Sequence, residues 1–290
     1  MRIVYHLGAH FTDEERILRC MLKNRDLLAR NNIVVPNPER YRSLLRETAF
    51  KLKGQTASIN EQALILEAIM EEDRADRMIL SWDSFLSLPK YMLNKGLYPS
   101  ATQRISAICK IFPEIEAEFH LALRNPASLL PALYRFQRKP DYSEFLKQTN
   151  PLDIYWSDVI ERILEANPGV PLTVWCDEDT PLIWPEVLRA VSGLPVDCQI
   201  DGEDEFLASL MSGEGLTRMQ AYVASHPPKT VAQRRKIVSA FLDKFALPER
   251  VDLTFQMPGW TPEMVAEMTE LYEEDVRRIS QMGNITFIAP

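Results

Sequence analysis

Hydrophobic positions along the chain fall into short runs that alternate with helical patterns. Short buried strands separated by helices are typical of a parallel sheet that is covered on both faces. The pattern therefore predicts an α/β fold, in which helices flank a mostly parallel sheet. The predicted strands are Arg2–Leu7, Ile33–Val35, Met78–Trp82, Glu118–Leu123, Leu172–Cys176 and Ile285–Ile288.

The segments between these runs have the spacing of amphipathic helices. From Asp13 to Arg30, apolar residues recur about every 3.6 positions, as a helix with one buried face requires. Ser58 and Glu61 have the spacing of a capping box, which predicts the start of a second long helix. Further helices are predicted over Gln103–Phe112, Leu129–Gln137, Tyr155–Ala166 and Trp184–Val191.

After Asp201 the pattern changes to helices alone. The turn-forming pieces between these helices are too short to be interdomain linkers. We therefore predict one domain over residues 1–290, with an all-helical elaboration over residues 201–282. The amphipathic last helix either docks on the body of this domain or forms the surface of a homodimer. The predicted helices are Phe206–Leu210, Leu216–Ala224, Val231–Phe245 and Pro262–Met282.

Composition narrows the class of protein. Apolar residues make up 46% and charged residues 26% of the 290 residues, as in ordinary globular proteins. A net charge of -8 repels phosphate backbones, so nucleic acid is not an expected partner. The four cysteines are far apart, which fits neither a zinc knuckle nor a disulfide scaffold. Without a signal peptide or an 18-residue apolar run, the chain is expected to be a bacterial-type cytoplasmic protein with no membrane span.

The first strand-to-helix turn is the place where an anion would bind in such a fold. Free N–H groups converge at the helix start, beyond the carboxyl end of the strand. Residues 6–16 read HLGAHFTDEER, which is a strand end, one glycine, a short loop and a helix start. This is the outline of a phosphate loop, but it lacks a lysine, a second glycine and the hydroxyl pair that enters the helix.

The stretch from His6 to Pro36 resembles the opening of bacterial sulfotransferase-family proteins, whose loop typically reads H-x-G-x-x-K-T-G-T-T. Met78–Asp83 resembles the family's strand that ends in Ser-Ser-Glu, and Leu121–Pro126 resembles the strand that ends in Arg-Asp/Asn-Pro. Leu172–Asp179 and Leu271–Val276 are similar to a later strand and to the closing helix. The resemblance implies a P-loop-like, sulfotransferase-like α/β fold.

The resemblance also implies a donor, 3′-phosphoadenosine 5′-phosphosulfate. The loop would hold its 5′-phosphosulfate, and Arg124 would bind its 3′-phosphate together with a serine that is Ala132 here. Thr12 matches the family's loop. Four other loop positions depart from it: Phe11 replaces the lysine, Asp13 the glycine, and Glu14 and Glu15 the two hydroxyl residues.

These acidic replacements predict that side chains of the loop itself occupy the anion-binding position at the start of the helix. Thr12 and Glu15 have the spacing of a capping box, and Asp13, Glu14 and Glu15 complement the helix dipole. A phosphate about 4 Å from one carboxylate meets roughly 1 kcal/mol of repulsion in water and about 4 kcal/mol at an effective dielectric of 20. We therefore expect no donor cofactor.

Five residues are candidates for a site. Thr12, Ser81 and Arg124 are predicted to line the cofactor-binding position, although Arg124 could instead pair with local carboxylates. His10 is the candidate general base for an acceptor hydroxyl, and Asp83 could face the same cleft. The alternatives without a catalytic role are that His10 is a surface histidine and that Asp83 caps a turn.

Two further clusters have weaker patterns. His6 and His10, with nearby acids, supply metal-type ligands, but their spacing fixes no coordination geometry, and no metal site is predicted. Asp177–Asp179 is either a solvated turn or a patch for a cation or a partner.

The leading hypothesis is a sulfotransferase-like protein with a degenerate phosphosulfate-binding loop and a binding or regulatory role toward an unidentified protein or glycan-type ligand. The alternative is an active sulfotransferase that uses Arg124 and the turn from Ser81 to Asp83 to act on a glycan or a small hydroxyl acceptor. A metal-assisted enzyme that uses His6 and His10 is a third. Whether the chain is an enzyme stays open at this point.

Overall fold

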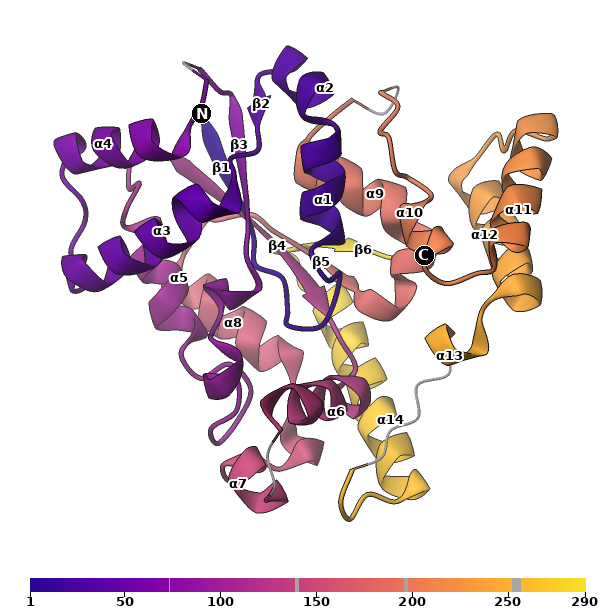
Figure 1. Ribbon diagram of the computed structural model, residues 1–290. Helices are drawn as coiled ribbons and strands as arrows, with labels where there is room; N and C mark the ends of the chain where they lie inside the picture. Colours follow the sequence, from indigo (N-terminus) through magenta and orange to yellow (C-terminus); the bar gives the residue numbers. More distant parts are fainter. Residues whose placement is uncertain (73, 139–140, 196–197, 252–256) are drawn as a thin grey trace.

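A parallel sheet of six strands forms the centre of the protein. The computed structural model describes residues 1–72, 74–138, 141–195, 198–251 and 257–290 (Figure 1). In this part of the chain the strand order is β2-β3-β1-β4-β5-β6, and every pairing is parallel. The predicted α/β class is therefore confirmed. The strands are β1 (Arg2–His6), β2 (Ile33–Val34), β3 (Arg77–Ser81), β4 (Glu116–Leu123), β5 (Leu172–Cys176) and β6 (Thr286–Ile288).

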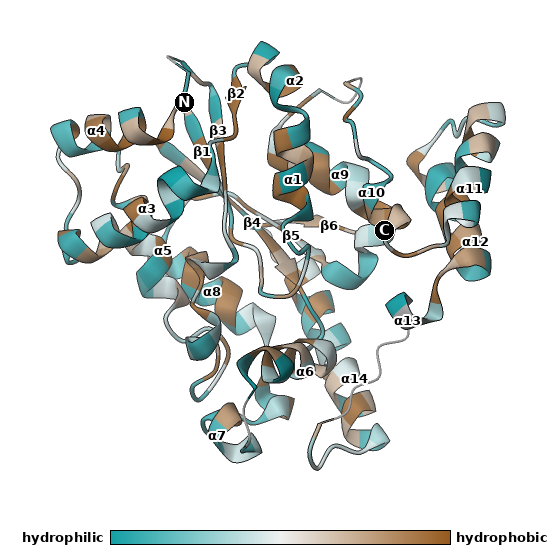
Figure 2. Ribbon diagram, viewed as in Figure 1, coloured by the Kyte–Doolittle hydropathy of each residue, from teal (hydrophilic) through white to brown (hydrophobic). Residues whose placement is uncertain are grey.

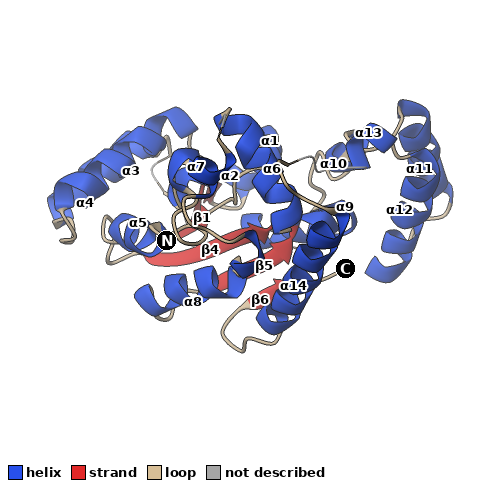
Figure 3. Ribbon diagram, turned by 90° about the horizontal axis from the view of Figure 1, so that it is seen from below, coloured by secondary structure: helices blue, strands red, loops and turns tan. Residues whose placement is uncertain are grey.

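Helices cover both faces of this sheet (Figure 3). Those that connect or follow the strands of the first half are α1 (Arg16–Lys23), α2 (Arg25–Arg30), α3 (Pro38–Leu52), α4 (Ile59–Ile69), α5 (Ala101–Cys109), α6 (Pro126–Gln137), α7 (Tyr142–Leu146), α8 (Trp156–Ala166) and α9 (Thr180–Ser192). The later helices are α10 (Glu205–Ala208), α11 (Gly213–Ser225), α12 (Val231–Phe245), α13 (Pro248–Val251) and α14 (Pro262–Ser280). Single 3-10 turns occupy Asp83–Phe85, Pro89–Tyr91, Pro151–Asp153 and Asp177–Asp179.

Alternation along the strands builds two separate cores. Side chains of successive strand residues point to opposite faces, so Tyr5 joins one core and Val4 the other. The larger core lies under α3, α5, α6, α8 and α14, and the smaller one under α1, α2 and α9. The helices therefore carry both hydrophobic and hydrophilic residues along their length, as the mixed brown and teal ribbons in Figure 2 show.

Two helical segments near the site differ from the sequence prediction, and the short helices α7 and α13 were not predicted either. The predicted helix from Asp13 to Arg30 begins only at Arg16 and is interrupted at Asn24. The Asn24 side chain donates to the carbonyls of Cys20 and Asp201 and accepts from the amide of Asp201, so it holds a distant loop at the break. Helix α3 was not predicted; its first turn is stabilised by Asn37, whose side chain accepts from the Glu39 amide.

The last of the helices after residue 201, α14, leads into β6, the final strand of the sheet. Helix α14 packs on α6 and α8 and buries Met268, Tyr272 and Ile279, which agrees with the prediction that it docks on the body. Strand β6 then pairs with β5. The hairpin of α11 and α12 lies to one side, in orange in Figure 1, and α12 contacts α9. None of the described helices is long and apolar enough to cross a membrane.

Candidate functional site

The candidate site lies at the carboxyl ends of β1 and β4. Strand β1 continues through α1 to β2 on one side of the sheet, whereas β4 continues to β5 on the other side. Ligands of open parallel sheets bind in the crevice where neighbouring strands diverge in this way. The loop of residues 7–15 leaves β1 at this point, Arg124 follows β4, and Asp83 follows β3.

Gly8 allows this loop to approach the turn after β3. Its φ is +65°, in the left-handed region that favours glycine. A Cβ atom at this position would lie 2.9 Å from the Cα of Asp83, which is closer than real Cβ atoms come to backbone. The glycine that the sequence assigned to a phosphate loop therefore serves as a contact point between two loops of the protein itself.

The loop is buried rather than open. Leu7, Gly8, Ala9 and His10 are buried, as are residues 12 and 13, while Phe11 is half-buried. Phe11 packs edge-to-face against Phe136 of α6, with ring centroids 5.6 Å apart. A loop that cradles phosphate needs its backbone N–H groups directed at the ligand. In this protein, by contrast, most residues of the loop are buried by other parts of the chain.

The predicted capping box of Thr12 and Glu15 is wrong. Glu15 has a left-handed backbone (φ 62°) and makes no side-chain capping hydrogen bond, and the Thr12 hydroxyl donates back to the Ala9 carbonyl at 2.8 Å. The carboxylate of Asp13 performs the capping instead, because its Oδ2 accepts from the Ile17 amide at 2.9 Å. The predicted cofactor position of Thr12 is thus part of the loop's own hydrogen bonding.

Glu14 and Glu15 do not occupy the anion-binding position, contrary to what the sequence led us to expect. Both are exposed. Glu14 pairs with Arg16 at 3.0 Å, and Glu15 pairs with Arg42 of α3 at 2.7 Å. Both residues have a left-handed backbone, with φ values of 50° and 62°. Asp13 is therefore the one acid of the three whose carboxylate takes up an amide at the start of α1.

The guanidinium of Arg124 bridges the crevice between β1 and β4. Its Nη1 donates to the carbonyl of Phe11 in the β1 loop, and its Nε donates to Ser128 Oγ at 2.8 Å. Ser128 in turn donates to the Asn125 carbonyl. The arginine that the resemblance assigns to a 3′-phosphate is consequently bound to two groups of the chain.

Asp177 and Glu178, at the end of β5, complete this side of the crevice. Burial raises the pKa of Asp177 to about 8, although the charge of Arg124 opposes the shift. Glu178 accepts from the Asn125 amide at 2.8 Å and from the Tyr272 hydroxyl at 3.0 Å, so it links β4 to α14. The acidic run after β5 is therefore more than a solvated turn.

His10 lies inside the protein, not on its surface. Its backbone amide donates to the Tyr98 hydroxyl at 3.1 Å, and its Nδ1 lies 2.9 Å from the same oxygen. A hydroxyl oxygen can accept two hydrogen bonds, so the Tyr98 hydroxyl either donates to Nδ1 or accepts from Nδ1–H, according to the histidine tautomer. Nε2 is buried and has no partner among the described residues. Nε2 can act as a general base in the tautomer whose ring proton lies on Nδ1, and it is a donor in the other tautomer.

Asp83 is the charged group of the pair predicted to be catalytic. It is exposed, and Ser84 Oγ donates to its Oδ1 at 3.1 Å. Burial lowers the pKa of His10, and the nearby charge of Asp83 partly offsets this effect. His10 and Asp83 are near enough for their charges to interact, and Gly8, in the same loop as His10, contacts the Asp83 backbone.

Ser81 is a core residue. Its hydroxyl lies 2.8 Å from Nδ1 of His6, and its carbonyl accepts from the Tyr41 hydroxyl at 2.7 Å and from Arg42. With only 4% of its surface exposed, Ser81 has its polar groups taken up by neighbouring strands and α3.

A row of buried polar side chains crosses the sheet beneath the site. Ser81, His6 and His120 occupy one register on β3, β1 and β4. His120 Nε2 lies 2.7 Å from Glu118, whose carboxylate also pairs with Arg77 at 2.6 Å. Among the described residues no group of three or more histidine, cysteine, aspartate or glutamate side chains is arranged to hold a metal ion.

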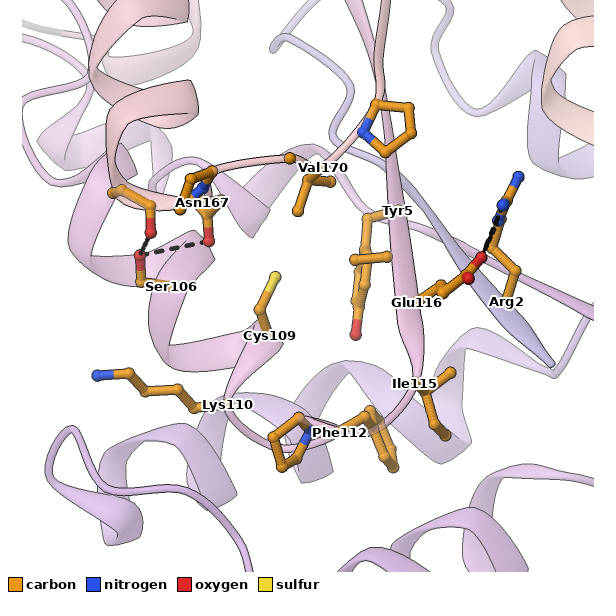
Figure 4. A pocket seen from close by; sticks show the side chains of 16 residues that line it. Arg2, Tyr5, Ser106, Cys109, Lys110, Phe112, Ile115, Glu116, Asn167 and Val170 are labelled. Atoms are coloured by element: carbon orange, nitrogen blue, oxygen red, sulfur yellow. Dashed lines mark hydrogen bonds and ion pairs between the residues drawn. The ribbon is translucent and has the colours of Figure 1, made fainter.

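A second hollow lies at the opposite, amino-terminal edge of the sheet (Figure 4). It has a volume of about 630 Å³ and is lined by the ends of β1, α5 and β4 and by residues 166–171. Tyr5 and Cys109 approach its centre from different elements, and Ser106 is bonded to Asn167 and to the Ala166 carbonyl. Burial raises the pKa of the Cys109 thiol to about 12, so it offers no thiolate nucleophile.

Several residues of the site have no sequence signal that singles them out. Tyr98 lies 88 positions from His10, and no motif or spacing connects them. Ser128 lies on α6, where its position in the helix pattern is unremarkable. Asp177 does have a signal, since it is the first polar residue after a predicted strand, the position at which ligands bind in parallel sheets.

The comparisons with known proteins are sparse. No protein-family model matches the chain, and no curated protein matches it. Among solved structures, the chain is similar to a crystal structure of sulfotransferase from Alicyclobacillus acidocaldarius. The two share 18% sequence identity over 83% of this chain and 98% of that chain, with a TM-score of 0.37.

Proposed function

We propose that the chain is a sulfotransferase-like α/β protein that binds a ligand or a partner and does not transfer sulfuryl groups. The β1 loop and Arg124 occupy the positions that the sequence resemblance assigns to the donor. The residues at these positions do not fit 3′-phosphoadenosine 5′-phosphosulfate. The helices of residues 201–282 would serve as an elaboration of one domain.

The observation that carries this proposal is the bridge between Arg124 and Phe11. An arginine that binds a phosphate presents its N–H groups as a free fork. Here the guanidinium donates to Phe11 and to Ser128, so it closes the crevice in which the donor would lie. Release of these hydrogen bonds would oppose the binding of any phosphate at this position.

The Asp13 carboxylate at the start of α1 also opposes the binding of a phosphate. The Asp13 carboxylate accepts the Ile17 amide, one of the N–H groups that would otherwise face an anion. A phosphate about 4 Å from this carboxylate is repelled by about 4 kcal/mol at an effective dielectric of 20. The loop has no lysine that could offset this repulsion.

Calorimetry with adenosine 3′,5′-bisphosphate tests the proposal. We expect no saturable heat up to millimolar ligand for the unmodified chain. The double variant Asp13→Gly, Phe11→Lys restores two of the family's loop residues. The same titration with this variant shows whether the side chains at positions 11 and 13 prevent nucleotide binding. Micromolar binding by the unmodified chain would refute the proposal.

An active transferase of the same fold is the second candidate. It is favoured by the buried Nε2 atom of His10, which has no partner in the described part of the chain and lies near the charge of Asp83. Such an enzyme would bind the bisphosphate, and Arg124→Ala would weaken that binding. His10→Gln would then abolish sulfuryl transfer to a hydroxyl acceptor while leaving nucleotide binding unchanged.

A further inference from the structure

A hollow between α3 and α5 combines an apolar floor with two arginines. Its volume is about 220 Å³. Ala49 and Phe50 of α3, Ala107 and Ile108 of α5, and Trp82, which follows β3, form its apolar lining. Arg46, Gln103 and Arg104 supply the polar part of the lining. None of its lining residues belongs to the loop of residues 7–15 or to the segment that follows β4, although Arg104 bonds the turn after β3.

Small side chains on two packed helices account for the hollow. Helices α3 and α5 contact each other, as their neighbouring positions in Figure 1 show. Ala49 and Ala107 are too short to fill the space between them, and both are half-buried. Phe50 is 81% exposed, so a large apolar ring stands at the edge of the hollow with little cover from the protein. An apolar ligand that entered would remove this surface from water.

Arg104 has a positive charge without a carboxylate partner in the described part of the chain. It is half-buried, and its Nε and Nη2 donate to the carbonyls of Phe85 and Ser84 at 3.3 and 2.7 Å. Its Nη1 makes no hydrogen bond to a described residue. These two carbonyls hold the guanidinium in place but leave its charge uncompensated.

A second cation lies close to the first. Burial and the neighbouring charge of Arg46 both lower the pKa of Arg104. Arg46 approaches Glu47 only at 3.9 Å, and both side chains of that pair are largely exposed. Two cations that repel each other at the edge of an apolar hollow would be stabilised by an anion between them.

We propose that the hollow between α3 and α5 binds a small amphipathic anion, a medium-chain carboxylate whose tail lies against Trp82 and whose head group lies between Arg46 and Arg104. The volume of about 220 Å³ favours a short to medium chain, for which octanoate serves as the probe. This proposal does not depend on whether the β1 loop binds a nucleotide.

Titration with three probes tests the proposal. Sodium octanoate carries both tail and charge, 1-octanol carries the tail alone, and acetate carries the charge alone. Octanoate should bind at least about tenfold more tightly than either of the others, with a dissociation constant below about 1 mM. If octanoate binds no more tightly than octanol or acetate, the proposal is wrong.

Variants then locate the site. Arg104→Gln should weaken octanoate binding about tenfold and leave octanol unchanged, because it removes a charge-assisted hydrogen bond and no apolar wall. Ala107→Leu should remove binding of both, because the added side chain fills the hollow. If Ala107→Leu does not fold, Ala49→Leu tests the same space from α3, and the exposed Arg46→Gln tests the charge.

Arg218→Gln is the matched control, since Arg218 pairs with Glu214 on α11, an element that does not line the hollow. It should bind octanoate as the unmodified chain does. Unchanged octanoate affinity in both Arg104→Gln and the space-filling variants would overturn the proposal, even if the unmodified chain binds octanoate.

Discussion

The guanidinium of Arg124 donates to the main-chain carbonyl of Phe11, 113 positions earlier in the chain. This hydrogen bond joins the residue that follows β4 to the loop that follows β1. Arg124 lies where a parallel sheet binds its ligands, but its hydrogen bonds stabilise the fold.

Arg124→Ala should reduce the free energy of unfolding by about 2–3 kcal/mol. The substitution removes charge-assisted hydrogen bonds to Phe11 and Ser128 and leaves both acceptors without their donor. Urea unfolding at pH 7 measures the change. Arg218→Gln, an exposed member of an i,i+4 pair, should change stability by less than about 0.5 kcal/mol. Equal effects of the two variants would show that Arg124 is not a structural bridge.

Gly8→Ala should be more destabilising than Gly54→Ala. Both glycines have positive φ values, +65° and +86°, so each substitution incurs the cost of a left-handed alanine, about 1–2 kcal/mol. At Gly8 the new methyl group also meets the Asp83 backbone at 2.9 Å, whereas at Gly54 nothing lies within 4 Å. The extra cost is about 1–3 kcal/mol. Denaturant unfolding of the two variants measures the difference, and the absence of one would contradict the packing of the β1 loop on the β3 turn.

Glu118→Gln should destabilise the protein by about 3 kcal/mol at pH 7, because it leaves the largely enclosed guanidinium of Arg77 without its carboxylate. Burial raises the pKa of Glu118, but hydrogen bonds from His120 and Arg77 outweigh it and hold the pKa at about 2. A lowered pKa contributes stability above the unfolded value, near 4.5, that is lost as the pH falls toward 2. The variant should therefore lose less stability than the unmodified chain between pH 5 and pH 2.

Glu116→Gln provides the control for this prediction. Glu116 also pairs with an arginine, Arg2, but its side chain is 72% exposed. Such a surface pair contributes about 0–1 kcal/mol. If both glutamate variants unfolded at the same urea concentration, the buried row would not be important for stability.

The effect of Asp177→Asn on the stability of the protein should become more favourable as the pH rises. Burial raises the pKa of Asp177 to about 8. A raised pKa means that the folded state keeps a proton that the unfolded state has lost, so this residue makes stability fall between about pH 4 and pH 8. Asparagine has no such proton. The difference in Tm between variant and unmodified chain should therefore shift in favour of the variant from pH 5 to pH 8.5.

The exposed Asp243 offers a comparison for the loss of one negative charge. Asp243→Asn should not reproduce the shift in Tm between pH 5 and pH 8.5. A constant difference between Asp177→Asn and the unmodified chain at both pH values would show that the Asp177 carboxyl does not titrate in this range.

Short apolar runs were sufficient to predict all six strands, because β1 to β5 are largely buried on both faces; β6, at the edge, is exposed or half-buried but keeps an apolar run. The run Leu172–Cys176 matches β5 from end to end. Helix α3 was missed because few of its positions are buried: Tyr41 and Leu45 are its buried residues. A mostly exposed helix has little hydrophobic pattern for a sequence analysis to detect.

The interior of the candidate site was harder to predict than its position. The order of strands and loops was enough to place Gly8, Asp83 and Arg124 at one edge of the sheet. Glu14 and Glu15 have a left-handed backbone and pair with Arg16 and Arg42, and Arg42 lies on α3, a helix that the sequence pattern did not predict. The partner of Arg124 is a backbone carbonyl, and a carbonyl has no sequence signature.

The most direct test of the central claim is a crystal structure of the protein after soaking with 3′-phosphoadenosine 5′-phosphosulfate. The account predicts that Arg124 still donates to Phe11, that Asp13 still accepts the Ile17 amide, and that no nucleotide density is seen at the β1 loop. A 5′-phosphosulfate bound at the start of α1, with Arg124 turned away from Phe11 toward the 3′-phosphate, would contradict it.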